Sequence, residues 1–397
     1  MIELSERLQA MEESATIAMS RKSRELKAEG KDVISLSLGE PDFHTPEFIK
    51  KAAIEGMEQN YTTYTPVPGY DDLREAICAK FERDNGLKYS KDQIVVSTGA
   101  KQSIANVVMS LINPGDKVLI PAPYWVSYIE IVKVAGGIPV VVNADIHSDF
   151  KLTGEQLENS LDDSIKMIIF STPCNPTGSV YSKEELQSLA KVISKYKNIT
   201  VISDEIYEHI NFVGKHESLA QFPEVFDQVV TINGMSKAWA MTGWRLGYIG
   251  APKEIAAACS KIQGQFTSGT CSITQRASIA ALKKDPDFLK DMLAAFKSRR
   301  ALVLKALQEM DGVLVNEPEG AFYFFPDVSS FFGKSFNGNV IKDANDLSMY
   351  LLEEALVALV TGDAFGDPNC IRISYATDEE TLTKAMNRIA KALKKLN

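Results

Sequence analysis

Short apolar runs and longer amphipathic segments alternate through the first three quarters of the chain. Runs rich in Val and Ile predict strands, at 94–96, 117–120, 138–142, 166–170, 199–203, 229–232 and 246–249. Apolar residues at helical spacing predict helices between most of them, including 71–83, 101–112 and 183–196. This order favours an α/β fold in which a mostly parallel sheet of seven strands carries helices on both faces.

The pattern changes after about residue 285. A charged helical stretch is followed by an aromatic run and two further helical patterns, at 288–310, 321–325, 343–355 and 379–396. Because 397 residues exceed the usual size of one hydrophobic core, we expect a second, smaller α+β domain here. We expect the N-terminal segment 1–45 to pack with this small domain, 285–397, while 46–284 forms the large domain.

Charge and composition argue against several classes of function. The 43 basic and 52 acidic residues give a net charge of −9, which opposes attraction to nucleic acid or to an anionic membrane. No stretch has the ~18 consecutive apolar residues of a membrane span, and the N-terminus lacks a signal-peptide pattern, so a cytoplasmic location is expected. The five cysteines are scattered without C-x-x-C spacing, which argues against a disulfide framework and a structural zinc site.

Polar residues follow three of the predicted strands directly. They are Asn175, the pair Asp204 and Tyr207, and Lys237. Ligands of open α/β sheets bind beyond the carboxyl ends of the strands, so these side chains are expected to share one crevice. Taken singly, each has a plain structural explanation: a lone lysine is usually a solvated charge, and a buried aspartate usually belongs to an ion pair or caps a helix.

A longer motif makes the chemistry specific. Residues 234–247 read GMSKAWAMTGWRLG, which resembles the pyridoxal-phosphate attachment site of class I aminotransferases. Further stretches follow in that family's order: SLGEPDF at 37–43, YTPVPG at 64–69, NPTG at 175–178, SDEIY at 203–207 and RISY at 372–375. The bacterial branch of aspartate aminotransferases is the most similar. The resemblance implies a fold-type I transferase with pyridoxal 5′-phosphate as cofactor, amino acids and 2-oxo acids as substrates, and a homodimer with active sites at the subunit interface.

The resemblance also implies roles around the cofactor ring. Lys237 would bind the cofactor as an imine and then carry a proton as general base and acid. Asp204 would pair with the pyridine nitrogen, and Tyr207 and Asn175 would donate to the phenolic oxygen. Trp125 would stack on the ring, although a core aromatic is the alternative for this residue.

The phosphate and the substrate carboxylates have implied partners as well. The phosphate would be held by the turn Gly99, Ala100 and Lys101 at a helix N-terminus, by Ser236 and Arg245, and by Tyr64 from the neighbouring subunit. The sequence departs from many relatives at Gly234, where they carry a hydroxyl. Arg372, Gly39 and Asn175 would hold the α-carboxylate, with a surface ion pair as the alternative for Arg372. Lys101 and Thr16 are candidates for the distal carboxylate.

The expected reaction is transfer of the amino group of L-aspartate to 2-oxoglutarate, giving oxaloacetate and L-glutamate by a ping-pong mechanism. The same residues would also suit an aromatic amino acid or prephenate aminotransferase, or a β-elimination, because the cofactor supplies the reactivity and side-chain contacts select the product. A non-enzymatic sensor module is the alternative outside the enzymes. The sequence leaves the physiological amino donor open.

Overall fold

A computed structural model describes residues 2–9 and 11–397. Its centre is a seven-stranded sheet in the order β2-β8-β7-β6-β5-β3-β4. The strands are β2 (Ile94–Ser97), β3 (Lys117–Ala122), β4 (Ile138–Asn143), β5 (Ile165–Ser171), β6 (Thr200–Asp204), β7 (Val229–Gly234) and β8 (Gly247–Gly250). All neighbours pair in parallel except β8, which is antiparallel to both β2 and β7. The mostly parallel seven-stranded sheet predicted from the sequence is therefore confirmed.

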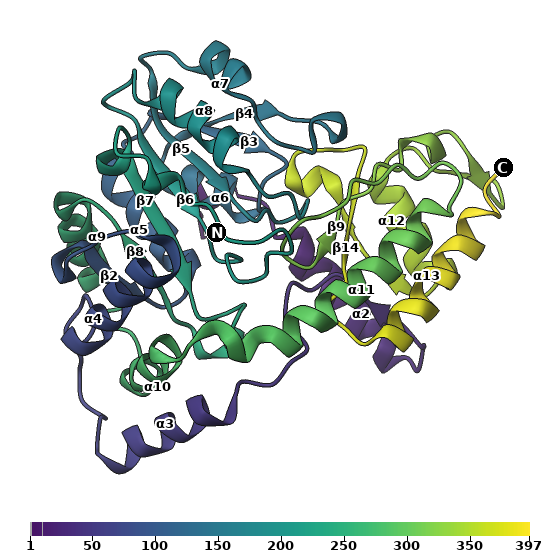
Figure 1. Ribbon diagram of the computed structural model, residues 1–397. Helices are drawn as coiled ribbons and strands as arrows, with labels where there is room; N and C mark the ends of the chain where they lie inside the picture. The colour runs from purple at the N-terminus through teal and green to yellow at the C-terminus, as the bar shows by residue number, and fades with distance from the viewer. Residues whose placement is uncertain (1, 10) are drawn as a thin grey trace.

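Both faces of the sheet are buried along six of its strands, whereas the edge strand β4 is partly exposed, and the period of two along the strands divides the buried side chains between two cores. On β5, Met167 and Ile169 face one core while Ile168 faces the other. Helices cover the two faces (Figure 1). The helices in this part of the chain are α3 (Glu47–Glu58), α4 (Asp71–Lys80), α5 (Ala100–Leu111), α6 (Ser127–Val134), α7 (Gly154–Ser160), α8 (Lys183–Ile193), α9 (Lys253–Phe266) and α10 (Ser272–Lys283). These continuous apolar strands explain why the sheet was predictable.

A smaller layer lies beside the sheet, and helix α11 (Lys290–Gln308) runs from one toward the other (Figure 1). It contains a three-stranded antiparallel sheet in the order β13-β14-β9. Its elements are β9 (Tyr323–Phe324), β10 (Ser335–Phe336), β11 (Asn339–Val340), α12 (Ala344–Glu354), β12 (Val357–Ala358), β13 (Val360–Thr361), β14 (Ile371–Ser374) and α13 (Glu379–Leu393). These short strands and helices differ from the longer strands of the central sheet.

The N-terminal segment meets this smaller layer. Strand β1 (Ile34–Ser35) pairs in parallel with β12, and α2 (Ala15–Ala28) packs against β12 and β13. The short helix α1 (Glu6–Gln9) contacts α6 instead. The division into the segments 1–45, 46–284 and 285–397, with the first packing on the third, stays a prediction.

Candidate active site

The carboxyl ends of β5, β6 and β7 meet at one edge of the sheet, because the parallel register sets Ser171 beside Asp204 and Asp204 beside Ile232. A cavity of about 370 Å³ opens at this edge. That volume is within the roughly 300–1,000 Å³ typical of small-molecule sites. Most of the predicted site residues line it: Thr16, Gly39, Ala100, Lys101, Trp125, Asn175, Asp204, Tyr207, Ser236, Lys237, Arg245 and Arg372. The two that do not are Gly99 and Tyr64.

Lys237 follows β7 and turns its amine into the cavity, where it donates to the carbonyl oxygen of Gly39 at 2.6 Å. Burial lowers the pKa of this amine to about 8, and the nearby positive charge of Arg372 adds to the effect. An amine with that pKa is unprotonated in roughly one molecule in ten at pH 7, far more often than an ordinary lysine. Lys237 is therefore prepared to act as a nucleophile.

Asp204 ends β6 and is 4% exposed. Burial raises the pKa of its carboxyl group to about 6, even though Tyr128 donates a hydrogen bond of 2.7 Å to it. Among residues 2–9 and 11–397, no cationic side chain lies within ion-pair distance of this carboxylate. The site therefore holds an acceptor that a protonated ring nitrogen would satisfy.

Tyr128 was not anticipated from the sequence. It lies on α6, three residues after Trp125, and the two rings meet edge to face with centroids 5.5 Å apart. Trp125 precedes the helix, and a turn in which the Tyr128 amide donates to the Trp125 carbonyl at 2.9 Å joins the two residues, so no helical spacing in the sequence signalled the pair. Tyr323 on β9 was also missed, because it is one aromatic among the many in 321–325.

One end of the cavity is formed by the start of α5, at the turn that follows β2. The amides of Ala100 and Lys101 start the helix and so have no acceptor within it. The Gly99 amide, by contrast, donates to the carbonyl of Ser97 at 2.8 Å. Gly99 contributes in another way: its φ is +86°, and a Cβ at this position would collide with the guanidinium of Arg245.

Arg245 closes this end from the turn after Lys237. Its φ of +55° is in the left-handed region, as is the φ of +49° at Ala240. Non-glycine residues held there cost about 1–3 kcal/mol each, so the turn stores strain next to the cavity. Ser236 is buried beside Lys237 on the same turn.

At Gly234 the structure leaves no space for a side chain. A Cβ at this position would lie 2.8 Å from the carbonyl oxygen of Leu246 and 2.9 Å from the Cα of Gly247. Strands β7 and β8 approach too closely here for any side chain on this backbone.

Arg372 also lines the cavity, and it is buried, with an exposed fraction of 2%. It donates to the Asn175 side-chain oxygen at 2.9 Å and to the Ser37 carbonyl at 2.5 Å. The alternative of a surface ion pair for this residue was wrong, because β14 is buried on both of its faces. Its Nε has no hydrogen-bond partner within the described part of the chain, which leaves a donor for an anionic ligand.

Lys101 and Thr16 lie on the cavity wall formed by α5 and α2. The ammonium of Lys101 is 4.9 Å from the ring centroid of Trp125. Desolvation and the neighbouring Arg245 lower the pKa of Lys101. Tyr64 is 98% exposed and remote from the cavity of its own chain.

Comparison with known proteins identifies the family. The profile of the family described as aminotransferase class I and II matches residues 31–389. The chain is 47% identical over 397 residues to the bifunctional aspartate aminotransferase and glutamate/aspartate-prephenate aminotransferase of Petunia hybrida, covering 99% of this chain and 83% of that protein. It is 47% identical over 389 residues to the aspartate/prephenate aminotransferase of Cereibacter sphaeroides, covering 97% of each.

Solved structures agree with the sequence comparison. The crystal structure of the aspartate aminotransferase from Rhizobium meliloti has a TM-score of 0.97 and 41% identity, covering all of both chains. The aspartate aminotransferase from Thermus thermophilus with maleate has a TM-score of 0.93 and 38% identity, covering 99% of this chain and 100% of the other.

The chain belongs to the class I and II aminotransferases. Its cofactor is therefore pyridoxal 5′-phosphate, and the fold is the fold-type I transferase fold expected from the motifs. The residues of this aminotransferase fit such a cofactor: a buried amine of lowered pKa, a buried carboxylate without a cation, and helix amides beside Arg245 surround one cavity. No helix in the described part of the chain is long and apolar enough to cross a membrane.

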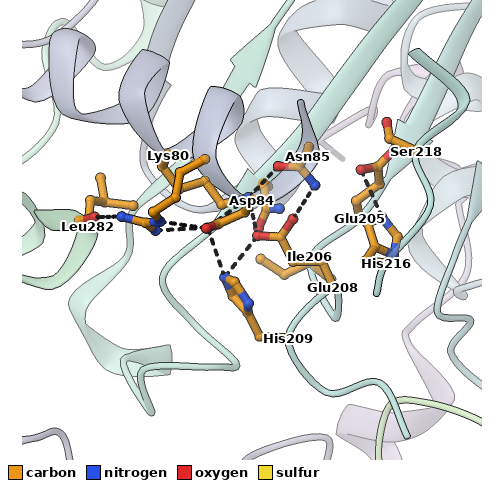
Figure 2. Close-up of polar contacts among 12 residues, drawn as sticks. Lys80, Asp84, Asn85, Glu205, Ile206, Glu208, His209, His216, Ser218 and Leu282 are labelled. Atoms are coloured by element: carbon orange, nitrogen blue, oxygen red, sulfur yellow. Dashed lines mark hydrogen bonds and ion pairs between the residues drawn. The ribbon is translucent and has the colours of Figure 1, made fainter. Parts of the chain in front are cut away.

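Directly after Asp204 in the chain, Glu205 and Glu208 belong to a second set of buried charges in the aminotransferase (Figure 2). Glu205 accepts hydrogen bonds from Ser203 at 2.8 Å and Ser218 at 2.7 Å, and lies 2.9 Å from His216. Glu208 forms an ion pair with Lys80 inside the protein. Burial alone would raise the pKa of Glu208, but Lys80 keeps it well below its usual range. The segment 204–208 is thus held from both sides.

Replacing Asp204 should change the stability of the cofactor-free protein in a pH-dependent way. Its folded-state pKa is about 6 against an ordinary 3.8, so ionising it opposes folding above pH 6, and the penalty vanishes below pH 4. Cofactor-free Asp204→Asn should therefore be more stable than wild type at pH 8 by about 2–3 kcal/mol. Urea unfolding at pH 8 and pH 4 measures this. An equal difference at both pH values, or one matched by the exposed Asp311→Asn, would refute it.

Breaking the Lys80–Glu208 pair should destabilise the protein. Lys80→Met leaves the Glu208 carboxylate buried without a cation, at a cost of about 3–5 kcal/mol. Adding Glu208→Leu should recover most of the loss. Lys195 pairs with Glu158 at the surface, so Lys195→Met is a matched control with an expected cost below about 1 kcal/mol. Similar urea midpoints for Lys80→Met and Lys195→Met would contradict the assignment.

Proposed function

We propose that the chain is an aspartate aminotransferase, which transfers the amino group of L-aspartate to 2-oxoglutarate by a ping-pong mechanism and yields oxaloacetate and L-glutamate. The main support is one cavity that the buried amine of Lys237 shares with two further cationic side chains, Arg372 and Lys101. A dicarboxylic amino acid presents two carboxylates with an amine between them. The printed names of the relatives, and maleate in the Thermus structure, point to the same substrate class.

Pyridoxal phosphate, when bound, supplies an electron sink that stabilises negative charge at the substrate Cα. Lys237 would hold the cofactor through its amine, and the same amine would serve as the base and acid that moves the proton of the substrate Cα. Asp204 would accept a hydrogen bond from the protonated ring nitrogen through its buried carboxylate. Tyr207 and Asn175 would donate hydrogen bonds to the phenolic oxygen, and Trp125 would pack against the ring.

Arg372 fixes the α-carboxylate of the substrate. Its guanidinium is planar and already held by Asn175 and Ser37, so it offers its remaining donors in one orientation. Gly39 contributes its backbone nearby. This placement sets the substrate Cα next to Lys237, which is the geometry that proton transfer requires.

Lys101 and Thr16 are the proposed ligands of the distal carboxylate. Both line the cavity. Another branch of the aspartate aminotransferases is expected to bind this carboxylate with an arginine near the stretch that corresponds to residues 261–265, and here that stretch reads KIQGQ, without an arginine. Prephenate is a second candidate substrate, because the Petunia and Cereibacter relatives carry it in their names. It also has carboxylates to offer, so both substrates would use the same positive groups.

A homodimer completes the proposal. Tyr64 is almost fully exposed in the single chain, as a residue that reaches the phosphate of a neighbouring subunit would be. The proposal also includes phosphate contacts from Ala100, Lys101, Ser236 and Arg245. It further includes a cytoplasmic location and the division into three segments.

Lys237→Ala should abolish the visible absorption of the lysine-bound cofactor and lower turnover by about a thousand-fold or more. In the wild type, borohydride reduction followed by peptide mapping should locate the adduct at position 237. Lys261→Ala, in an exposed part of α9, serves as the control and should keep the band. An adduct on another lysine would refute the assignment.

Lys101→Ala should lower turnover of aspartate relative to alanine. Losing one charged hydrogen bond to the distal carboxylate should reduce the ratio of the two kcat/KM values by roughly 10- to 100-fold. Lys101→Arg keeps the charge and should retain more of the ratio. An unchanged ratio in Lys101→Ala would remove Lys101 from this role, and the same assay with prephenate tests the second substrate.

A further inference from the structure

Tyr323 touches both halves of the proposed site, although no role for it follows from the motifs. It is 0% exposed and lies on β9 in the cavity wall. Its hydroxyl is 2.7 Å from the hydroxyl of Tyr207, and its ring centroid is 4.7 Å from the guanidinium carbon of Arg372. It therefore bridges the residue that faces the cofactor and the residue that faces the substrate.

The backbone fixes the place of this ring. Tyr323 pairs with Ser374 across the antiparallel ladder, and Arg372 is two residues away on the same face of β14. Phe365 contacts the other side of the same guanidinium at 4.8 Å. Gly39 leaves room for the Tyr323 hydroxyl, because a Cβ there would collide with it. The position of the hydroxyl is thus determined from several directions.

The number of protons on the two phenols determines which hydroxyl, that of Tyr207 or that of Tyr323, donates the hydrogen bond between them. A phenol has one proton to donate, and burial raises the pKa of both phenols, so both keep that proton. Within the described residues, the two hydroxyls have only each other as hydrogen-bond partners. If Tyr207 donates its proton to the phenolic oxygen of the cofactor, Tyr323 must be the donor to Tyr207. A hydroxyl that accepts one hydrogen bond donates the next one more strongly.

We propose that Tyr323 is a positioning residue for the transamination site: its hydroxyl donates to Tyr207 and orients that residue toward the cofactor, and its ring supports the guanidinium that binds the α-carboxylate. This inference rests on the proposed function. The two contacts come from different parts of one side chain, so they can be separated by substitution.

Tyr323→Phe removes the hydroxyl and keeps the ring. The readout is the pH titration of the visible band of the lysine-bound cofactor, whose midpoint is lowered by donors to the phenolic oxygen. The midpoint should rise by about half a pH unit, because Tyr207 becomes a weaker donor. Tyr207→Phe should raise it further, and the double variant should match Tyr207→Phe. The other titratable or charged groups that face Tyr207, Tyr323 and Lys237 stay in place: Asp204, Arg372, Glu40 and Arg245.

Tyr375→Phe is the matched control. It removes a buried hydroxyl from the adjacent strand region, where Tyr375 donates to the Ala321 carbonyl at 3.1 Å, without touching Tyr207. Its titration midpoint should equal that of the wild type. An unshifted midpoint in Tyr323→Phe, an equal shift in Tyr375→Phe, or additive shifts in the double variant would overturn the role of the hydroxyl.

Tyr323→Leu tests the ring. The dissociation constant of maleate should rise roughly ten-fold in Tyr323→Leu and stay near the wild-type value in Tyr323→Phe, which retains the aromatic face under Arg372. Equal affinities in the two variants would overturn this part. Failure of the proposed function is distinguishable, because the wild type would then not transfer the amino group of aspartate to 2-oxoglutarate, whereas the titration midpoints would still report the role of the Tyr323 hydroxyl.

Discussion

Lys237 and Asp204 are ionisable groups that are buried away from solvent, and the reactivity of the site depends on this exclusion of water. Burial lowers the pKa of the amine to about 8 and raises the pKa of the carboxyl group to about 6, so at pH 7 both groups keep most of their charge, and each charge is held at a desolvation cost. A ligand with a cationic ring nitrogen and an aldehyde relieves both conditions together. The protein therefore holds energy in the ligand-free state that favours binding of this particular cofactor.

The segment after β6 achieves this by dividing its residues between two environments. Asp204 and Tyr207 face the cavity, while Glu205 and Glu208 face a buried network that satisfies their charges (Figure 2). A short turn that carries an unpaired charge on one side could otherwise adopt other local conformations. The ion pair with Lys80 and the hydrogen bond from Ser218 restrain this segment. Its residues that face the cavity are therefore held in place by its residues that face the buried network.

The sequence indicated the sheet well because its strands are nearly all apolar, and it indicated the residues after β5, β6 and β7 because parallel strands end at one edge. The sequence did not indicate contacts between residues that lie far apart along the chain. Tyr128 reaches Asp204 from α6, and the Ser37 carbonyl meets Arg372 from the N-terminal segment. Even the burial of Arg372 was hidden, since alternation along β14 normally indicates one exposed face and here both are covered.

The close approach of β7 and β8 at Gly234 limits how this aminotransferase can change. With the Leu246 carbonyl and Gly247 filling the space that a side chain would take, a serine cannot be introduced there by one substitution on the present backbone. The two strands would have to separate, and β8 is hydrogen-bonded on both sides within the sheet. A side chain at position 234 would therefore have to be preceded by changes at neighbouring positions that move the two strands apart.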